Sequence, residues 1–371
     1  MDREKEWYKR ISMHDYVVID NDIYFFALNY NGLYKMSILD RQLEFLGAAP
    51  EEEYYRRHLY GAITECNGKL YMPPMNGEEI AIYDLNTNLF EKIKLRYSAE
   101  GVTSKFYGAL TYNGKVFLIP ARYSYLVVID SVTGNVEYVD EWIKLLDVPT
   151  DYTELYVKNG YFIRNNKLYL ASMVDNSLIK ISMDTYDAEI VSIEGGADGF
   201  MDMCEDTDGE YIWFIQRTKP DIIKWNELTG ESQKFSCFPD GFVNNGFPFI
   251  NIFCNDEMVC AVAYQTNMSI EINKSTGEMK EALWDVNPEE TDLNAWNAKH
   301  YFAKKKKDGN WVLANLDDNS FYITDGKQLI EKFYLTDEYA RERIVFIKEK
   351  VQREREYYNL NDYLRFIVNG D

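Results

Sequence analysis

Residues 66–74 read CNGKLYMPP, and residues 112–120 read YNGKVFLIP. Both stretches place Asn-Gly, then Lys, then a run of apolar residues at the same offsets. Asn and Gly tolerate positive φ at both central positions of a two-residue turn, and such a turn matches the twist of the strands that it joins. Each stretch therefore predicts a β-hairpin, and their separation of 46 residues predicts a structural repeat.

The same signal, an Asx-containing turn followed by an apolar run, occurs seven times along the chain. Successive turns are separated by 46, 46, 52, 43, 47 and 53 residues. The seven turns are Asn21-Asp22, Asn67-Gly68, Asn113-Gly114, Asn165-Asn166, Asp208-Gly209, Asn255-Asp256 and Asp308-Gly309. Four-stranded units that repeat every 40–50 residues or so are typical of a β-propeller.

A second mark recurs inside the units, where an Asp or Asn precedes another turn. It is seen in AIYDLNTN, VVIDSVTGN, IKWNELTGE and IEINKSTGE, at Asp84, Asp130, Asn226 and Asn273. Each unit thus holds four short strands, a to d, with tight a–b and c–d turns and longer b–c and d–a loops. A β-sandwich would not repeat its turns at this fixed spacing.

We therefore predict an all-β fold, a seven-bladed β-propeller over residues 1–335 with blades of about 48 residues. A six-bladed ring is the alternative, if the first or last copy is a decoy. Each unit holds all of its own strands, so we expect the first and last blades to meet without sharing one.

The chain resembles the broad β-propeller superfamily, including kelch-like and bacterial seven-bladed propellers, over residues 12–335. The paired glycines of kelch repeats and the Trp-Asp dipeptide of WD40 repeats are missing. The resemblance therefore implies no specific family and carries over no functional residue.

Residues 336–371 interrupt the strand pattern with TDEYARERIVFIKEKVQREREYYNLNDYLRFIVNGD. Apolar residues recur there at helical spacing, at Ile344, Ile347, Val351 and Tyr358. We predict a C-terminal helical extension that packs on the propeller. The alternative is a helix that binds a partner or a second copy.

Charge and cysteine content narrow the classes of partner. The net charge of −21 opposes binding to nucleic acid and to anionic membrane surfaces. Five scattered cysteines without a Cys-x-x-Cys pair are typical of reduced thiols. The sequence has no signal-peptide core and no apolar run long enough to span a membrane, so a cytoplasmic location is expected.

The d–a and b–c loops should meet on one face of the disc, where function concentrates. The long d–a loops cover residues 47–61, 140–160 and 287–300. The predicted ligand-binding residues on this face are Arg56, Arg57, Arg122, Tyr123, Trp142, Arg217 and Trp296.

Candidate catalytic residues on the same face are His58, Tyr60 and His300. A His base beside an Arg that neutralises a carboxylate would suit β-elimination on a uronic acid. The alternative is that each His is a hydrogen-bonded structural residue. Three widely separated His give no metal-ligand spacing, and motifs for nucleotide, nicotinamide, serine-hydrolase and zinc-protease chemistry are absent, so no metal or cofactor is predicted.

Two further motifs have simple structural interpretations. EDTDGE at residues 205–210 resembles the start of a calcium loop but falls on an a–b turn, so we interpret it as a hairpin. KKKK at residues 304–307 precedes another turn and is expected to be a solvated strand end.

The sequence favours a binding or interaction propeller whose loop face engages a protein or a glycan. The alternative is an enzyme, for example a lyase, that acts on a sugar or other small polar molecule in the central funnel. Convergence of the polar residues on one concave pocket would favour the enzyme, and a flat aromatic surface would favour the interaction module.

Overall fold

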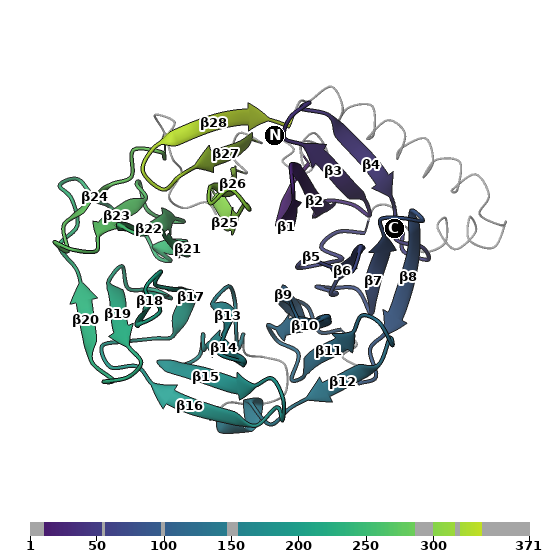
Figure 1. Ribbon diagram of the computed structural model, residues 1–371, viewed down its shortest axis with the longest axis horizontal. Coiled ribbons are helices and arrows are strands. Elements are labelled where there is room, and N and C mark those ends of the chain that lie inside the picture. Colours follow the sequence, from purple (N-terminus) through teal and green to yellow (C-terminus); the bar gives the residue numbers. More distant parts are fainter. Residues whose placement is uncertain are drawn as a thin grey trace, which may run out of the picture.

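The computed structural model is a ring of seven antiparallel sheets around a central axis (Figure 1). It describes residues 11–53, 56–97, 101–146, 155–285, 300–315 and 320–335, and residues 300–302 through their backbone alone. Each sheet has four strands in chain order, so every blade is a simple meander. The predicted seven-bladed β-propeller is confirmed, and the six-bladed alternative is wrong because the first and last copies both form complete blades.

The first four blades follow one another without interruption. Blade 1 comprises β1 (Met13–Ile19), β2 (Asp22–Ala27), β3 (Leu33–Ser37) and β4 (Leu43–Gly47). Blade 2 comprises β5 (Thr64–Cys66), β6 (Lys69–Met72), β7 (Glu79–Asp84) and β8 (Leu89–Lys94). Blade 3 comprises β9 (Phe106–Tyr112), β10 (Lys115–Pro120), β11 (Leu126–Asp130) and β12 (Val136–Val139), with a short 3-10 helix at Ile143–Leu145 after it. Blade 4 comprises β13 (Tyr161–Arg164), β14 (Lys167–Ala171), β15 (Ser177–Ser182) and β16 (Ala188–Ser192).

The last three blades complete the ring. Blade 5 comprises β17 (Phe200–Glu205), β18 (Tyr211–Gln216), β19 (Ile222–Asn226) and β20 (Ser232–Phe235). Blade 6 comprises β21 (Phe249–Cys254), β22 (Met258–Ala263), β23 (Ile270–Asn273) and β24 (Met279–Glu281). Blade 7 comprises β25 (His300–Lys305), β26 (Trp311–Asn315), β27 (Ser320–Thr324) and β28 (Leu329–Tyr334). The first strand of each blade lies nearest the axis and the fourth lies at the rim (Figure 1).

The tight a–b turns have the backbone conformation that the sequence predicts. Asn67 and Gly68 have φ of 52° and 75°, and Asn113 and Gly114 have φ of 48° and 75°. In blade 1 the turn lies one residue earlier than predicted: Ile19 pairs with Asp22, so the two turn residues are 20 and 21. EDTDGE forms part of the hairpin between β17 and β18, as predicted.

The second mark of each unit is a side-chain cap on the c–d turn. Asp130 Oδ1 accepts hydrogen bonds from the backbone N–H groups of Val132 and Thr133, at 3.0 and 2.7 Å. The Asn226 Oδ1 atom accepts two equivalent bonds, at 2.9 and 3.0 Å. These bonds lower the pKa of Asp130, and they explain why a short oxygen-bearing side chain recurs at this position.

The ring closes by packing and not by a shared strand, as the sequence predicts. Blades 1 and 7 form separate sheets. Between them, Tyr16 donates from its hydroxyl to Val312 O at 2.6 Å, and its ring meets Phe321 edge-on. Side chains from both blades form one buried cluster, and ion pairs such as Lys304 with Asp15 also cross the junction, so closure depends on apolar burial and a few long-range polar contacts.

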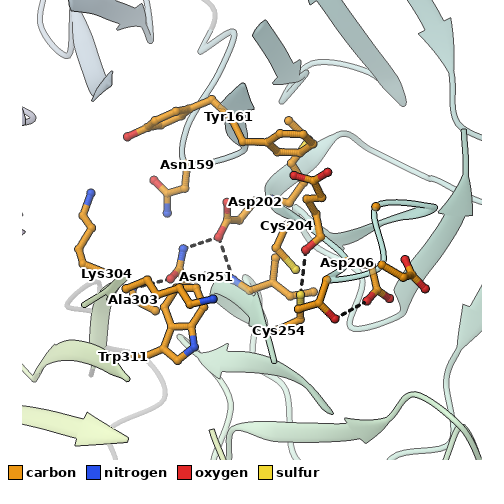
Figure 2. Close-up of a pocket in the computed structure, with 18 residues that line it drawn as sticks. Asn159, Tyr161, Asp202, Cys204, Asp206, Asn251, Cys254, Ala303, Lys304 and Trp311 are labelled. Atoms are coloured by element: carbon orange, nitrogen blue, oxygen red, sulfur yellow. Dashed lines mark hydrogen bonds between the residues drawn. The ribbon is translucent and has the colours of Figure 1, made fainter. Parts of the chain in front are cut away.

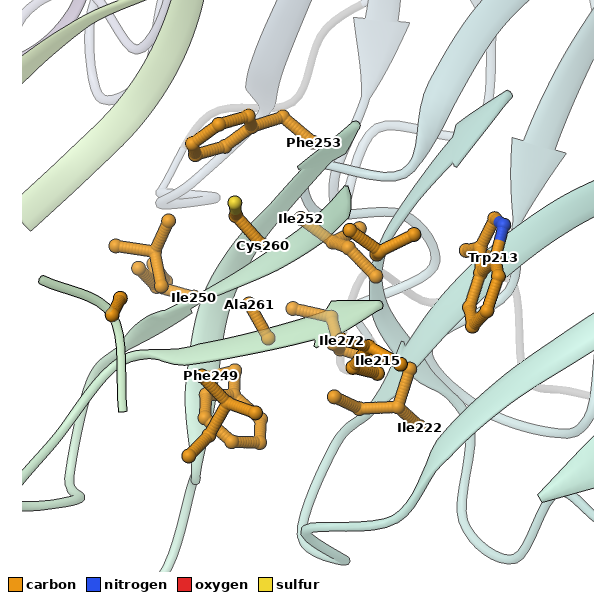
Figure 3. Packing of buried hydrophobic residues seen from close by; sticks show 14 of the residues in the cluster. Trp213, Ile215, Ile222, Phe249, Ile250, Ile252, Phe253, Cys260, Ala261 and Ile272 are labelled. Carbon is orange, nitrogen blue, oxygen red and sulfur yellow. The ribbon is translucent and has the colours of Figure 1, made fainter. Parts of the chain in front are cut away.

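The same kind of packing fills the space between the other blades. All six residues of β22 are buried. Trp213 and Ile215 of blade 5 pack in one cluster with Ile252 of blade 6 and other apolar residues of β21 to β23 (Figure 3). The cluster also includes Leu313 and Tyr322 of blade 7, so the core is continuous from one blade to the next.

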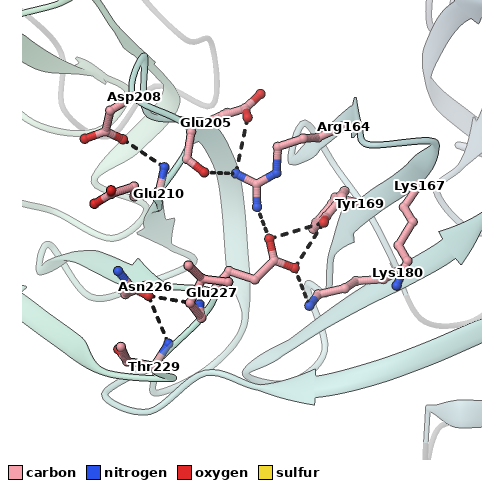
Figure 4. Close-up of polar contacts among 12 residues, drawn as sticks. Arg164, Lys167, Tyr169, Lys180, Glu205, Asp208, Glu210, Asn226, Glu227 and Thr229 are labelled. Atoms are coloured by element: carbon pink, nitrogen blue, oxygen red, sulfur yellow. Dashed lines mark hydrogen bonds and ion pairs between the residues drawn. The ribbon is translucent and has the colours of Figure 1, made fainter.

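A polar network joins blades 4 and 5 outside this core (Figure 4). Glu227 accepts from Lys180 at 2.5 Å, from the hydroxyl of Tyr169 at 3.0 Å and from Arg164. Arg164 also contacts Glu205 at 3.2 Å. The side chains of Arg164 and Lys180 are each only 9% exposed, so Glu227 neutralises two cations that are largely removed from water.

Several other predictions concern the whole chain. The predicted C-terminal helix falls at residues 336–371, which lie outside the described residues. Within the part of the chain that the structure covers, no helix has the length and hydropathy that a membrane span requires. All five cysteines are free thiols.

We predict that Glu227→Gln lowers the free energy of unfolding by about 2 kcal/mol, because it leaves the largely buried Lys180 without its counter-charge and Arg164 with Glu205 alone. Burial raises the pKa of Glu227, but Lys180 and Arg164 lower it by more than burial raises it, so the net shift is downward. The loss of stability should therefore be complete above the ordinary Glu pKa of 4.5. It should disappear as the pH falls through the lower pKa that Glu227 has in the folded protein. Urea unfolding at pH 7 and pH 3.5 would measure both effects.

The matched control is Glu189→Gln on β16 in blade 4, the blade that supplies Lys180 and Arg164, because its ion pair with Lys167 is about half exposed at both ends. It should cost no more than about 0.5 kcal/mol. Equal losses for the two variants, or a Glu227→Gln loss that persists in acid, would contradict the assignment.

Candidate functional site

The inner strands carry bulges that turn polar side chains toward the axis. The pairing between first and second strands shifts register in five blades: between Met13 and Tyr16, Ile119 and Pro120, Phe200 and Asp202, Phe249 and Asn251, and Tyr301 and Lys304. A bulge re-aims a side chain that regular alternation would place elsewhere. The residues at or beside these bulges include the buried polar residues His14, Asp15, Asp202 and Asn251.

His14, Tyr107 and Lys158 form a stack that we call the lysine–aromatic cluster. The His14 and Tyr107 rings are parallel to within 15°, with centroids 4.6 Å apart. Lys158 Nζ lies 4.6 Å from the centroid of the Tyr107 ring, within the range of a cation–π contact. His14 Nδ1 is 2.8 Å from Gly61 O, and since a carbonyl only accepts, Nδ1 carries the proton and Nε2 the lone pair.

Burial sets the charge states in this cluster. Burial, with Lys158 second, lowers the pKa of His14 to about 3, so its imidazole is neutral at physiological pH. Burial also lowers the pKa of Lys158 to about 8. Lys158 is therefore mostly cationic near neutral pH but loses its proton within the range in which many enzymes work.

Among the described residues, Lys158 differs from two other inward-facing lysines in having no counter-ion. Lys105 donates to Gly77 O at 3.0 Å and pairs with Glu78, and Lys304 pairs with Asp15 at 2.7 Å. Lys158 makes no hydrogen bond or ion pair to any residue that the structure describes. Its side chain is partly exposed.

Two cationic or titratable groups from the predicted set lie near this cluster. Arg122 and Tyr107 both bond to Ser104, Arg122 through its backbone N–H to Ser104 O at 3.1 Å and Tyr107 through its hydroxyl to Ser104 Oγ at 2.7 Å. Burial raises the pKa of Tyr107, while the Ser104 bond and the positive charge of Arg122 act in the opposite direction. The charge of His58, when it is protonated, lowers the pKa of His14. The Nε atom of Arg122 is buried without a hydrogen-bond partner among the described residues.

A second group of polar residues lines a cavity of about 620 Å³ near the axis, which we call the axial cavity (Figure 2). Its wall combines residues from blades 4 to 7, including Tyr161, Asp202, Asn251 and Lys304. Asn159, at the entry to blade 4, donates to Ile250 O at 2.7 Å, while its Oδ1 is buried with no partner in the described ranges. The ring of Tyr161 lies over Gly108, and a Cβ atom added to Gly108 would come within 2.4 Å of that ring.

Asp202 connects the cavity wall to the next blade. Its carboxylate accepts from the backbone N–H groups of Met203 and Ile252, both at 2.8 Å, and from the amide of Asn251. Burial raises the pKa of Asp202 to about 7 although these bonds act in the opposite direction. Burial lowers the pKa of Lys304, but Asp15 and other neighbours raise it, so the net shift is upward and this lysine remains a cation.

The predicted arginines have different surroundings. Arg56 is held by Glu52 at 2.7 Å and by Asn76 O at 3.2 Å, and Arg57 is exposed on the same loop. Arg217 follows β18 directly, and its Nε is buried without a partner in the part of the chain described. Of the predicted ligand-binding residues, Arg122 is the one for which the structure records an interaction with the lysine–aromatic cluster.

Three predicted site residues belong to the core instead. Tyr60 is 4% exposed and meets Phe26 edge-on, and Tyr123 is fully buried with its hydroxyl bonded to Tyr97 O. Trp142 is also fully buried and packs on Tyr156. These placements disagree with the predicted contact to a ligand, because the long loops fold their aromatic rings inward to cover apolar strand edges.

Two predicted residues lie beyond the side chains that the structure describes. Trp296 lies outside the described residues. His300 begins β25 and pairs with Asn315 through the backbone. Among the described residues, no group of three or more His, Cys, Asp or Glu side chains could hold a metal ion.

Sequence reasoning missed Tyr107, Lys158, Asp202 and Lys304. Lys304 belongs to the stretch that we expected to be a solvated strand end, yet it pairs with Asp15 on the inner strand of blade 1. Lys307 of the same stretch does behave as expected, because it is 83% exposed. A polar residue in the middle of an inner strand, as in MDMCE, was the available signal.

Comparison with known proteins defines the fold and leaves the family open. No family model matches the chain, and no curated protein matches its sequence. A catalytically inactive His-to-Ala variant of virginiamycin B lyase from Staphylococcus aureus, solved with quinupristin, has a TM-score of 0.61 and 13% identity over 83% of this chain and 93% of that one. A streptogramin B lyase has a TM-score of 0.61 and 15% identity over 83% and 91%.

A chain of the mitotic checkpoint complex is also similar, with a TM-score of 0.56 and 11% identity over 84% of this chain and 85% of that one. The lyases share the β-propeller fold with this chain. Similarity at these identities shows the fold alone. The fold therefore accommodates lyases and components of protein assemblies, and the function of this chain must be argued from its own site.

We predict that Lys158 titrates near pH 8 in the folded protein, as its burial implies. At that pH about half of its side chain is unprotonated, against well under 1% for an ordinary lysine. Competitive labelling with acetic anhydride from pH 6 to pH 11, read by mass spectrometry, would measure the midpoint. Lys144, which is exposed, is the reference, and a Lys158 midpoint above pH 10 in folded protein would refute the assignment.

Proposed function

We propose that this propeller binds a small polar molecule that carries a carboxylate, beside the lysine–aromatic cluster and on the face built by the d–a and b–c loops. The observation that carries the proposal is Lys158, a buried ammonium for which the described residues supply no counter-ion. A buried charge without a partner is costly, and a ligand anion would supply the missing charge.

The surroundings of Lys158 support an anionic ligand. The chain as a whole carries a net charge of −21, yet the cations Arg122 and Lys158 both act on groups of this cluster. Arg122 offers a planar donor set that matches a carboxylate, and Lys158 offers a point charge. A local positive field in an acidic protein concentrates small anions there.

The shape of the site supports a small molecule with an apolar ring face. The stacked rings of His14 and Tyr107 offer a flat surface of the kind that packs against a sugar or aromatic ring. Polar groups of the axial cavity wall adjoin this surface, because Asn159 follows Lys158 in the chain and Lys304 acts electrostatically on His14. A few fixed polar groups around a concave space are typical of ligand sites.

Proton transfer on such a ligand is a second candidate function. The observation that favours it is the pKa of Lys158, about 8, which lets the amine act as a base close to neutral pH. His58, from the predicted catalytic set, lies close enough to His14 to influence it. Two structural neighbours are lyases, and one of them was solved as an inactive His-to-Ala variant, which is compatible with this second candidate.

We predict that thermal unfolding in the presence of glucuronate, galacturonate and small hydroxy acids gives a higher midpoint for at least one acid, and no shift for glucose or galactose. The sugars are matched pairs that differ in the carboxylate alone. A ligand at 100 times its dissociation constant would add about 2.7 kcal/mol, which is readily seen. Equal shifts for the acid and neutral members, or no shift with any acid, would refute the proposal.

The role of Lys158 is tested by Lys158→Met, with Lys144→Met as the matched control on the exposed 3-10 helix. Removal of a charged hydrogen-bond partner should weaken binding about tenfold or more. The affinity of the unmodified protein should fall as the pH rises above about 8, because the cation that binds the anion is then lost. Calorimetry at pH 7 and pH 9.5 would show a large change for the unmodified protein and a small one for Lys158→Met.

A further inference from the structure

Two cysteine thiols from neighbouring blades lie together on the wall of the axial cavity. Cys204 belongs to β17 in blade 5, and Cys254 belongs to β21 in blade 6. Their side chains are adjacent in Figure 2, and each thiol affects the pKa of the other. The function proposed above uses neither residue.

The alignment of the two inner strands accounts for this proximity. Both strands carry a bulge at the same place, just before Asp202 and just before Asn251. The Asp202 carboxylate then accepts from Ile252 N at 2.8 Å. Cys204 lies two residues after Asp202, and Cys254 lies two residues after Ile252. Strand side chains repeat with a period of two, so the register that pairs Asp202 with Ile252 also brings the two cysteines together. A second contact, from Cys254 Sγ to Glu205 O at 2.8 Å, holds this register.

The two thiols differ in acidity. The hydrogen bond from Cys204 and the positive charge of Lys274 lower the pKa of Cys254 despite the effect of burial. Burial, followed by the hydrogen bond with Cys254, raises the pKa of Cys204. Cys254 therefore loses its proton more readily than Cys204, giving up the bond that its thiol donates to Glu205 O, and Cys204 remains a protonated thiol nearby.

The other cysteines do not share this arrangement. Cys66 donates to Ser131 Oγ at 3.4 Å, and Cys260 is buried beside Gly326 O at 3.4 Å with its pKa raised by burial. Cys237 is exposed. Among the described residues, Cys204 and Cys254 are the cysteines that line the axial cavity together.

We propose that Cys204 and Cys254 form an oxidation site that a hydroperoxide converts into a disulfide between blades 5 and 6. The Cys254 thiolate attacks one oxygen of hydrogen peroxide, the O–O bond breaks, and the departing hydroxide takes a proton to become water. Cys254 is then a sulfenic acid. The Cys204 sulfur attacks the sulfenic sulfur, the S–O bond breaks, and the thiol proton leaves with the hydroxide as a second water.

The balance is two thiols and one peroxide giving one disulfide and two waters. The peroxide is reduced and the sulfurs are oxidised, so no further reactant is needed. A dithiol would reverse the change by exchange. The disulfide would lie two residues from Asp202 on β17, so oxidation would link two blades at the wall of the axial cavity.

The test uses the full chain with Cys237→Ser, which removes the exposed thiol that could join two molecules. Folded protein is treated with one equivalent of hydrogen peroxide, unfolded, alkylated and digested. Mass spectrometry should show a peptide joining residues 204 and 254, with Cys66 and Cys260 still fully alkylated. Dithiothreitol should restore both thiols.

The order of attack is tested by Cys204→Ser and Cys254→Ser. The first should accumulate a sulfenic acid at Cys254 that dimedone traps, and the second should leave Cys204 unmodified at the same peroxide dose. Full alkylation of both thiols in the parent protein after peroxide would overturn the proposal, and so would disulfides distributed equally among Cys66, Cys204, Cys254 and Cys260. The parent-protein result decides the matter even if a Ser variant fails to fold, and it does not depend on any ligand.

Discussion

The ring depends on hydrogen bonds that inner-strand side chains make to the main chain of the next blade. The seven sheets share no strand, so no backbone ladder connects one blade to another. Asp15 accepts from Ile63 N at 3.1 Å, Asp202 from Ile252 N at 2.8 Å, and Asn251 from Ala303 N at 2.5 Å. Each bond satisfies a backbone donor at a sheet edge that faces the axis, and apolar packing between blades supplies the rest of the cohesion.

This way of joining blades places carboxylates and cations where water is scarce. Most of them are explained by the joining itself: Asp15 is balanced by Lys304, and Asp202 by three donors. Lys158 has no such partner among the residues that the structure describes. A cation without a described counter-charge, next to two stacked rings, is the strongest reason to look for a ligand there, because perturbed charges concentrate at functional sites.

The turns and the blade count were predictable because they depend on local chemistry. Asn67-Gly68 and Asn113-Gly114 have few alternatives to a tight hairpin turn, and Asp130 caps its own turn from two residues away. The site was not predictable in the same way. Bulges decide whether a residue such as Asp202 faces the axis, and they arise from packing between blades. The exposure of Trp142 was likewise decided by a tertiary contact, with Tyr156, that no local pattern records.

The loop face therefore contributes less to the candidate site than residue type alone indicates, and the inner strands contribute more. Arg122 and His58, from the predicted set, act on groups of the inner strands, Arg122 on Tyr107 and His58 on His14. Binding needs only the charge and ring surface that these groups present. Catalysis needs in addition a base placed against a particular atom of a substrate, and Lys158 suits that task because its pKa is lowered to about 8, whereas His14, with a pKa of about 3, is too weak a base. The distinction between a binding propeller and a lyase thus reduces to where a bound carboxylate would place its neighbouring C–H bond relative to the Lys158 nitrogen.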